Sequence, residues 1–152
     1  MSDALDRDEL CLRLGEAVAA VPAIDVAYLF GSRAGGTARA DSDVDVAIHH
    51  AHATDGRARE QAQEELLATL AAALGRVAER IDLVDLDRAS STLAFRVIRD
   101  GRRVFERSAR VRANLEARIA RRYDDDEPHR RLFREAAVRV GKEMERQANG
   151  RS

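Results

Sequence analysis

Residues 26–48 read VAYLFGSRAGGTARADSDVDVAI. An apolar segment ends at Gly31-Ser32, a glycine-rich turn follows, and a second apolar segment opens with Asp43-Val44-Asp45. Successive side chains of a β-strand point to opposite faces of the sheet, so Asp43 and Asp45 fall on one face and their apolar neighbours on the other. The stretch therefore predicts two strands joined by a turn, with two carboxylates side by side at the start of the second strand.

The turn and the acid pair together indicate one kind of chemistry. Neighbouring carboxylates can hold divalent cations, and a Gly-Ser turn offers backbone N–H groups where an anion can sit. Gly31-Ser32 alone would indicate an ordinary turn or a helix cap, and the downstream Asp43 and Asp45 reverse that preference. The pattern predicts a metal-dependent site that uses a nucleotide.

A spacing of ten residues between Gly31-Ser32 and Asp43-x-Asp45 resembles the signature of the DNA polymerase β-like nucleotidyltransferases. In so short a chain, GSRAGGTARADSDVDVAI resembles the minimal nucleotidyltransferase (MNT) antitoxins, the MntA-type adenylyltransferases that partner HEPN-domain RNase toxins. The resemblance in element order continues to about Phe105. It implies a minimal polymerase β-like α/β (α+β) fold, with a small mixed sheet flanked by helices and with C-terminal helices. We expect a nucleotidyltransferase domain over residues 1–107 and a helical extension over residues 108–152 that packs on the core or on a partner.

The same resemblance implies transfer of AMP from ATP to a tyrosine hydroxyl of a cognate HEPN RNase toxin, which neutralises the toxin. Two Mg²⁺ ions would stabilise the attacking and leaving oxygens. The implied metal-binding and catalytic residues are Asp43, Asp45 and Asp82, and the implied nucleotide-binding residues are Gly31, Ser32 and Arg33. Two alternatives stay open: a non-catalytic antitoxin that acts by binding, and a nucleotidyltransferase that acts on a small molecule.

The third carboxylate has two candidates, Asp82 and Asp85, in the predicted strand over residues 80–86. Asp85 shares a face with Ile81 and Leu83, whereas Asp82 lies on the opposite face. If the face of Ile81 and Leu83 packs against helices, Asp82 points toward the active site. The family resemblance favours the same residue, so we predict Asp82, with Asp85 as the alternative.

Basic residues around the turn are less easily assigned. Arg33 and Arg39 flank it, and either guanidinium could pair with phosphate oxygens. The alternative for both is a solvated loop arginine. Gly35 stands where the family often has a second basic residue, which removes one phosphate contact.

The 152-residue chain carries 26 Lys and Arg against 27 Asp and Glu, for a net charge of -1. This balance disfavours direct binding to DNA or RNA through phosphates. The sole cysteine, Cys11, excludes an intramolecular disulfide, and the acidic start does not have the pattern of a signal peptide. No apolar run approaches the roughly 18 residues of a membrane span. We therefore expect a cytoplasmic protein without membrane association.

Hydrophobic periodicity and breaker residues predict the remaining elements. The predicted helices cover residues 4–20, 57–74 and about 91–100, and the predicted strands cover 25–30, 80–86 and 102–106. From Ser108 onward the chain is expected to be helical. The last helix has an apolar stripe that either folds back on the core or supplies a docking surface: Leu132, Phe133, Ala136, Ala137, Val140 and Met144.

Two other groups of residues invite a functional interpretation. His49, His50 and His52 suggest zinc, but the ligands that would complete a structural zinc site are missing from the sequence pattern, so an exposed polar loop is favoured. A locally basic region is interpreted as surface charge, with a partner-facing patch as the alternative; it comprises Arg96, Arg99, Arg102 and Arg103.

Overall fold

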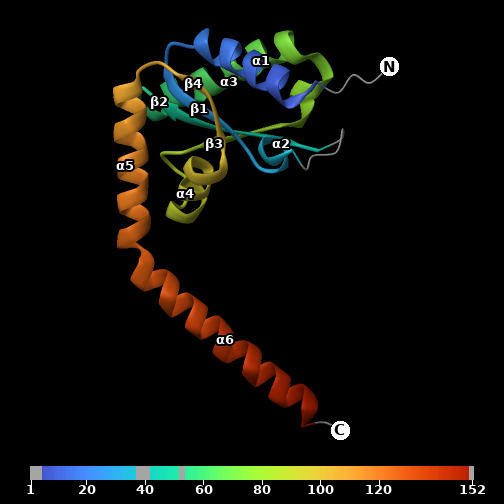
Figure 1. The fold of residues 1–152 in the computed structure, drawn as a ribbon, viewed down its shortest axis with the longest axis vertical. Helices are drawn as coiled ribbons and strands as arrows, with labels where there is room; N and C mark the ends of the chain where they lie inside the picture. The colour runs from blue at the N-terminus through green and yellow to red at the C-terminus, as the bar shows by residue number, and fades with distance from the viewer. Residues whose placement is uncertain (1–4, 37–41, 52–53, 151–152) are drawn as a thin grey trace.

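A computed structural model describes residues 5–36, 42–51 and 54–150 of the chain. The elements alternate between helices and strands up to Glu106 and are helical thereafter (Figure 1). Their bounds, in chain order, are α1 Arg7–Ala19, β1 Ile24–Phe30, α2 Ser32–Gly35, β2 Val44–His50, α3 Gly56–Leu74, η1 Gly75–Arg80, β3 Ile81–Asp85, α4 Ser91–Asp100, β4 Arg102–Glu106, α5 Ala109–Asp125 and α6 Glu127–Asn149.

The four strands form one mixed sheet in the order β3-β2-β1-β4. Strand β1 pairs antiparallel with both β2 and β4, and β2 pairs parallel with β3. The parallel pair is joined by α3, which is the crossover helix that a parallel connection requires. The predicted α/β fold with a small mixed sheet flanked by helices is confirmed.

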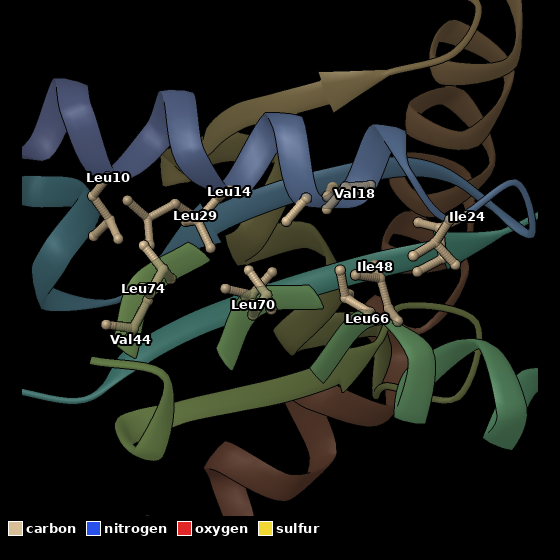
Figure 2. Close-up of a cluster of buried hydrophobic side chains, with 14 of the residues drawn as sticks. Leu10, Leu14, Val18, Ile24, Leu29, Val44, Ile48, Leu66, Leu70 and Leu74 are labelled. Carbon is tan, nitrogen blue, oxygen red and sulfur yellow. The ribbon is translucent and has the colours of Figure 1, made fainter. Parts of the chain in front are cut away.

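Helices cover both faces of the sheet (Figure 1). One face packs against α1 and α3, where Leu14, Leu66 and Leu70 meet β-strand side chains such as Val46 and Ile48 in the larger core cluster (Figure 2). The opposite face packs against α4 and α5 in a smaller cluster that includes Val26, Tyr28, Ala47, Val97 and Leu115. Along β2 the side chains alternate between the two clusters, as the period of a strand requires.

Capping side chains set the helix ends. The Asp6 carboxylate accepts a hydrogen bond from Glu9 N and starts α1 at Arg7, later than predicted. The Ser90 hydroxyl accepts a hydrogen bond from Leu93 N and starts α4 at Ser91, close to the predicted start. Gly75 follows α3 with a φ of 58°, a conformation that favours glycine.

The C-terminal helices differ in how they contact the rest of the molecule. Helix α5 packs on the sheet, burying Leu115 and Ile119, and the Tyr28 hydroxyl donates a 2.7 Å hydrogen bond to Glu116. Helix α6 extends away from the sheet and has no buried residue (Figure 1). Its apolar stripe is exposed, with Phe133 81% and Met144 65% accessible. None of the helices in the described part of the chain is both long enough and apolar enough to cross a bilayer.

The expectation of an exposed histidine loop is wrong for two of its three residues. Strand β2 continues through His49 and His50, because their backbones pair with the start of β1. His50 is only 1% exposed, and His49 is half-buried. His52 lies outside the described residues.

Candidate active site

Strand register brings two of the predicted acids together. In the parallel pairing of β2 and β3, Asp45 lies directly opposite Asp82. On its other side Asp45 pairs with Phe30, the last residue of β1, so it stands one residue from Gly31. Asp43 lies just before β2 and is exposed. The sheet thereby gathers the acids beside the Gly-Ser turn, at the end of β1.

The two candidates on β3 point to opposite faces of the sheet. Ile81 and Leu83 pack against the core cluster beneath α1 and α3. Asp82 and Val84 belong to the other face, where both line a cleft under α4. Asp85 shares the side of Ile81 and forms an ion pair with Arg59 of α3. The face of Ile81 and Leu83 therefore packs against helices, which is the condition under which Asp82 was expected to point toward the active site. Asp82 lies beside Asp45.

Repulsion among the acids affects Asp45. Burial raises the pKa of Asp45 above its ordinary value, and the nearby negative charges of Asp82 and Asp43 raise it further. Within the described residues, no arginine, lysine or histidine forms an ion pair with any of these three carboxylates. The cluster is thus a concentration of negative charge that the described side chains leave uncompensated.

The absence of a side chain at Gly31 lets the backbone lie close to the carboxylate of Asp45. Its backbone has a φ of 72° and a ψ of -156°, a region that only glycine adopts readily. A Cβ at this position would overlap Oδ2 of Asp45. Ser32 follows as the first residue of the short helix α2 and is exposed.

The Arg33 side chain spans the turn. Its Nε and Nη2 atoms donate hydrogen bonds of 3.3 and 3.0 Å to the carbonyl oxygen of Ser42. The guanidinium therefore ties α2 to the residue that precedes Asp43. The other predicted loop arginine, Arg39, lies outside the described residues.

A cleft of about 500 Å³ opens over these groups. Its floor is the end of the sheet, and its wall is one side of α4. Among the described residues that line it, Arg96 is the one cationic side chain. The lining residues are Phe30, Gly31, Gly35, Asp45, Asp82, Val84, Leu93, Arg96, Asp100 and Gly101.

The model of the Polymerase beta, Nucleotidyltransferase family matches residues 14–110, a segment that holds the turn, the acids and the cleft. The chain belongs to the polymerase beta nucleotidyltransferase family. A relative within it is the protein adenylyltransferase MntA of Shewanella oneidensis (strain MR-1), which is 38% identical over 85 residues. That match covers 56% of this chain and 56% of MntA, so it spans little more than half the length of the relative.

Solved structures show the same fold. A chain in a toxin–antitoxin complex with AMP-PNP superposes with a TM-score of 0.65 at 25% identity, covering 88% of this chain and 99% of that one. A chain in the complex of tri-AMPylated Shewanella oneidensis HEPN toxin with MNT antitoxin gives a TM-score of 0.58 at 24% identity, over 90% and 98% of the two chains.

The chain also has a second polar cluster, at the opposite end of β2 and β3. His50, Asp85 and Asp87 lie close enough to share a metal ion. The Nη1 atom of Arg59 stands among them, 3.0 Å from Asp85 Oδ2 and 3.1 Å from Asp87 Oδ2. It is also 3.3 Å from Nδ1 of His50. The Arg59 guanidinium therefore occupies the place that a metal ion would take. Its contacts join α3 to the sheet.

Positively charged or hydrogen-bonding side chains face the carboxylates of this second cluster. Burial alone would raise the pKa of Asp87, but the hydrogen bonds and positive charges of His49 and Arg59 outweigh burial and lower that pKa to about 2. His49 Nδ1 lies 2.9 Å from Asp87 Oδ1. Burial lowers the pKa of His50, which favours its neutral form. This feature separates the two clusters: Arg59 forms ion pairs with both Asp85 and Asp87, whereas no described cation pairs with Asp43, Asp45 or Asp82.

Arg96 is a cleft residue that the sequence pattern does not reveal, because the pattern indicates surface charge at this position. Leu93, Arg96 and Asp100 are spaced i, i+3 and i+7, and all three line the cleft. Val97, on the adjoining face of α4, is fully buried against the sheet. The helical spacing was the available signal, but only the packing of α4 shows which side of the helix faces the acids.

Proposed function

We propose that this protein is a Mg²⁺-dependent adenylyltransferase antitoxin, which transfers AMP from ATP to a tyrosine hydroxyl of a HEPN RNase toxin and so neutralises it. The observation that carries the proposal is the uncompensated acid cluster, in which Asp45 and Asp82 are cross-strand neighbours beside Gly31. Membership of the nucleotidyltransferase family supports the reaction class.

Asp43, Asp45 and Asp82 are the residues that would hold divalent cations. Carboxylate oxygens are the ligands that Mg²⁺ prefers. Burial raises the pKa of Asp45, and repulsion from Asp82 and Asp43, which a cation would relieve, raises it further. A bound pair of such ions supplies electrostatic stabilisation to the attacking and leaving oxygens of phosphoryl transfer. The donor set therefore fits the metal that the family implies.

The remaining site residues would position the reactants. Gly31 and Ser32 would let the triphosphate approach the backbone closely, and Arg33 would contact its phosphates. The acceptor hydroxyl forms a bond to the α-phosphorus while the bond to the β-phosphate oxygen breaks, releasing pyrophosphate. Asp82 is exposed on the edge strand β3, where an acceptor from another macromolecule can reach it, and is proposed to take the hydroxyl proton.

Helix α6 is proposed to dock on the toxin. Phe133, Ala137, Val140 and Met144 recur at helical spacing on one side of a helix that makes little contact with the rest of the chain. An amphipathic helix with an exposed apolar stripe is suited to a groove on a partner. That relatives of this fold occur in toxin–antitoxin complexes supports a toxin as the occupant.

The relatives also support the nucleotide and the modification. The 38% identical relative is named a protein adenylyltransferase, and one structural neighbour was solved with AMP-PNP, an analogue of ATP. In another, the HEPN toxin is tri-AMPylated.

The test combines purified protein, Mg²⁺, ATP labelled on the α-phosphate, and the product of the adjacent gene, the proposed toxin. We expect label on the toxin with the wild-type protein and with Asp124→Ala, a control at an exposed carboxylate on α5. Asp43→Ala should give none. Label transfer that survives Asp43→Ala contradicts the metal assignment. Neutralisation of the toxin without any label favours the antitoxin that acts by binding alone.

A further inference from the structure

We propose that Arg96 binds the phosphate chain of the nucleotide in the candidate active-site cleft. This inference deepens the proposed function and rests on it, because it assigns one more substrate contact in the same cleft. Arg96 belongs to no distinguishing sequence motif, and the packing of α4 places it in the cleft.

The side of α4 that bears Arg96 faces the acids. Leu93, Arg96 and Asp100 all line the cleft, while Ala94 and Val97 are buried beneath them against the sheet. The buried pair fixes the rotation of the helix, so the backbone of Arg96 stays on the side of α4 that faces the cleft. Its charge also acts on the cleft wall: the pKa of Asp100 is lowered mainly by the hydrogen bonds from Arg99, and Arg96 adds a smaller effect.

The charge balance of the cleft favours a cation at this position. Three carboxylates and a triphosphate carry more negative charge than two divalent cations can neutralise. Arg96 is the one cationic side chain among the described lining residues, and no described residue forms an ion pair with it. A guanidinium that is not engaged by a carboxylate can pair in bidentate fashion with phosphate oxygens.

The direction of α4 indicates that Arg96 contacts the phosphates of the nucleotide rather than its base. From Leu93 the helix runs toward Gly101, and the next residue, Arg102, pairs with Leu29 of β1. Leu29 lies two residues before Gly31, where the triphosphate is proposed to approach the backbone. Arg96 therefore lies along the helix between an apolar part of the cleft at Leu93 and the glycine turn.

Binding measurements with Arg96→Ala and Arg96→Lys test this assignment. The matched control is Arg110→Ala, an exposed arginine on α5 outside the cleft. Each protein is titrated with AMP-PNP and with inorganic tripolyphosphate, both in Mg²⁺, by calorimetry. We expect Arg96→Ala to weaken both ligands by a similar factor, about ten- to hundredfold, as loss of a charged hydrogen-bonding group predicts. Arg96→Lys should retain part of the affinity, and Arg110→Ala should bind like the wild type.

Two results overturn the inference: unchanged AMP-PNP binding by Arg96→Ala, or weakened AMP-PNP binding with unchanged tripolyphosphate binding, which would assign Arg96 to the base or sugar. Thermal unfolding of each variant checks that the fold is intact, and Arg96→Lys provides the comparison if the alanine variant is unstable. If binding depends on Arg96 but the wild type transfers no AMP to the toxin, the proposed function fails while the phosphate contact stands. A wild-type protein that binds neither ligand overturns both.

Discussion

The α-carbon of Gly31 lies against the carboxylate of Asp45, so closely that a Cβ on Gly31 would overlap Oδ2 of Asp45. This contact joins the turn that follows β1 to the acid at the centre of the cluster. It requires glycine for two separate reasons, the space and the φ of 72°. The relationship explains why the Gly-Ser turn and the acid pair occur together.

Gly31→Ala should destabilise the protein and prevent transfer. The left-handed backbone alone costs about 1–3 kcal/mol for a residue with a Cβ, and the overlap with Asp45 adds to it. Urea unfolding measures the loss. Gly35→Ala is the matched stability control, because a Cβ there meets nothing within 4 Å. Equal unfolding free energies for the two variants would contradict the close contact.

Asp45→Asn should raise the stability of the protein and lower its rate of AMP transfer. Because the pKa of Asp45 is raised in the folded state, ionised Asp45 disfavours folding at pH values above its unfolded pKa. The asparagine variant should therefore be more stable than the wild type at neutral pH without Mg²⁺. Its transfer rate should fall by about two orders of magnitude or more. A less stable variant at pH 7 would contradict the repulsion among the acids.

Asp82→Asn and Asp85→Asn should have opposite effects. Asp82 has no described ionic partner and its charge repels that of Asp45, so its replacement should abolish transfer without lowering the unfolding free energy at neutral pH. Asp85 accepts hydrogen bonds from Arg59 and from the backbone N–H of Asp87. Asp85→Asn should cost about 1–3 kcal/mol and retain catalysis in the folded protein. Label transfer combined with urea unfolding distinguishes them, and the reverse pattern would exchange their roles.

The ionisation of Asp87 should make the free energy of unfolding depend on pH in the acidic range. Its pKa falls from 3.8 to about 2 on folding, so its ionised form stabilises the folded state above pH 3.8. That stabilisation, about 2 kcal/mol at most, should disappear as the pH falls from 3.8 through 2. Unfolding free energies of wild type and Asp87→Asn, measured between pH 5 and 2, should converge toward the acidic end of this range. A constant difference across these pH values would contradict the prediction.

Phe133→Asp should disrupt toxin binding without disrupting the fold. Phe133 is 81% exposed, so its replacement should change the unfolding free energy by about 0.5 kcal/mol or less. Affinity for the toxin should fall at least about tenfold, because a charge then enters the apolar stripe. Glu135→Ala, on the opposite side of α6, is the control. Toxin binding by Phe133→Asp that equals the wild type would exclude α6 as the docking helix.

The sequence by itself determined the elements and the identity of the acids near the turn. Alternating apolar residues indicated β2 up to Ile48 and the face of the sheet on which Asp45 lies, since strand parity is a local property of the backbone. Serine and glycine signals fixed the ends of α3 and α4 for the same reason. Even the choice between Asp82 and Asp85 was reduced to one condition, namely which face of β3 packs on helices.

Only the tertiary structure decided the points that depend on neighbours distant in the sequence. The packing of α1 and α3 assigns Asp85 to Arg59 and leaves Asp82 beside Asp45. Strand pairing buries His50, which the sequence alone assigned to an exposed loop. Rotation of α4 turns Arg96 into the cleft, and the direction of α6 leaves its apolar stripe exposed. Each outcome depends on long-range burial, because local periodicity defines the faces of an element but not the partner that each face meets.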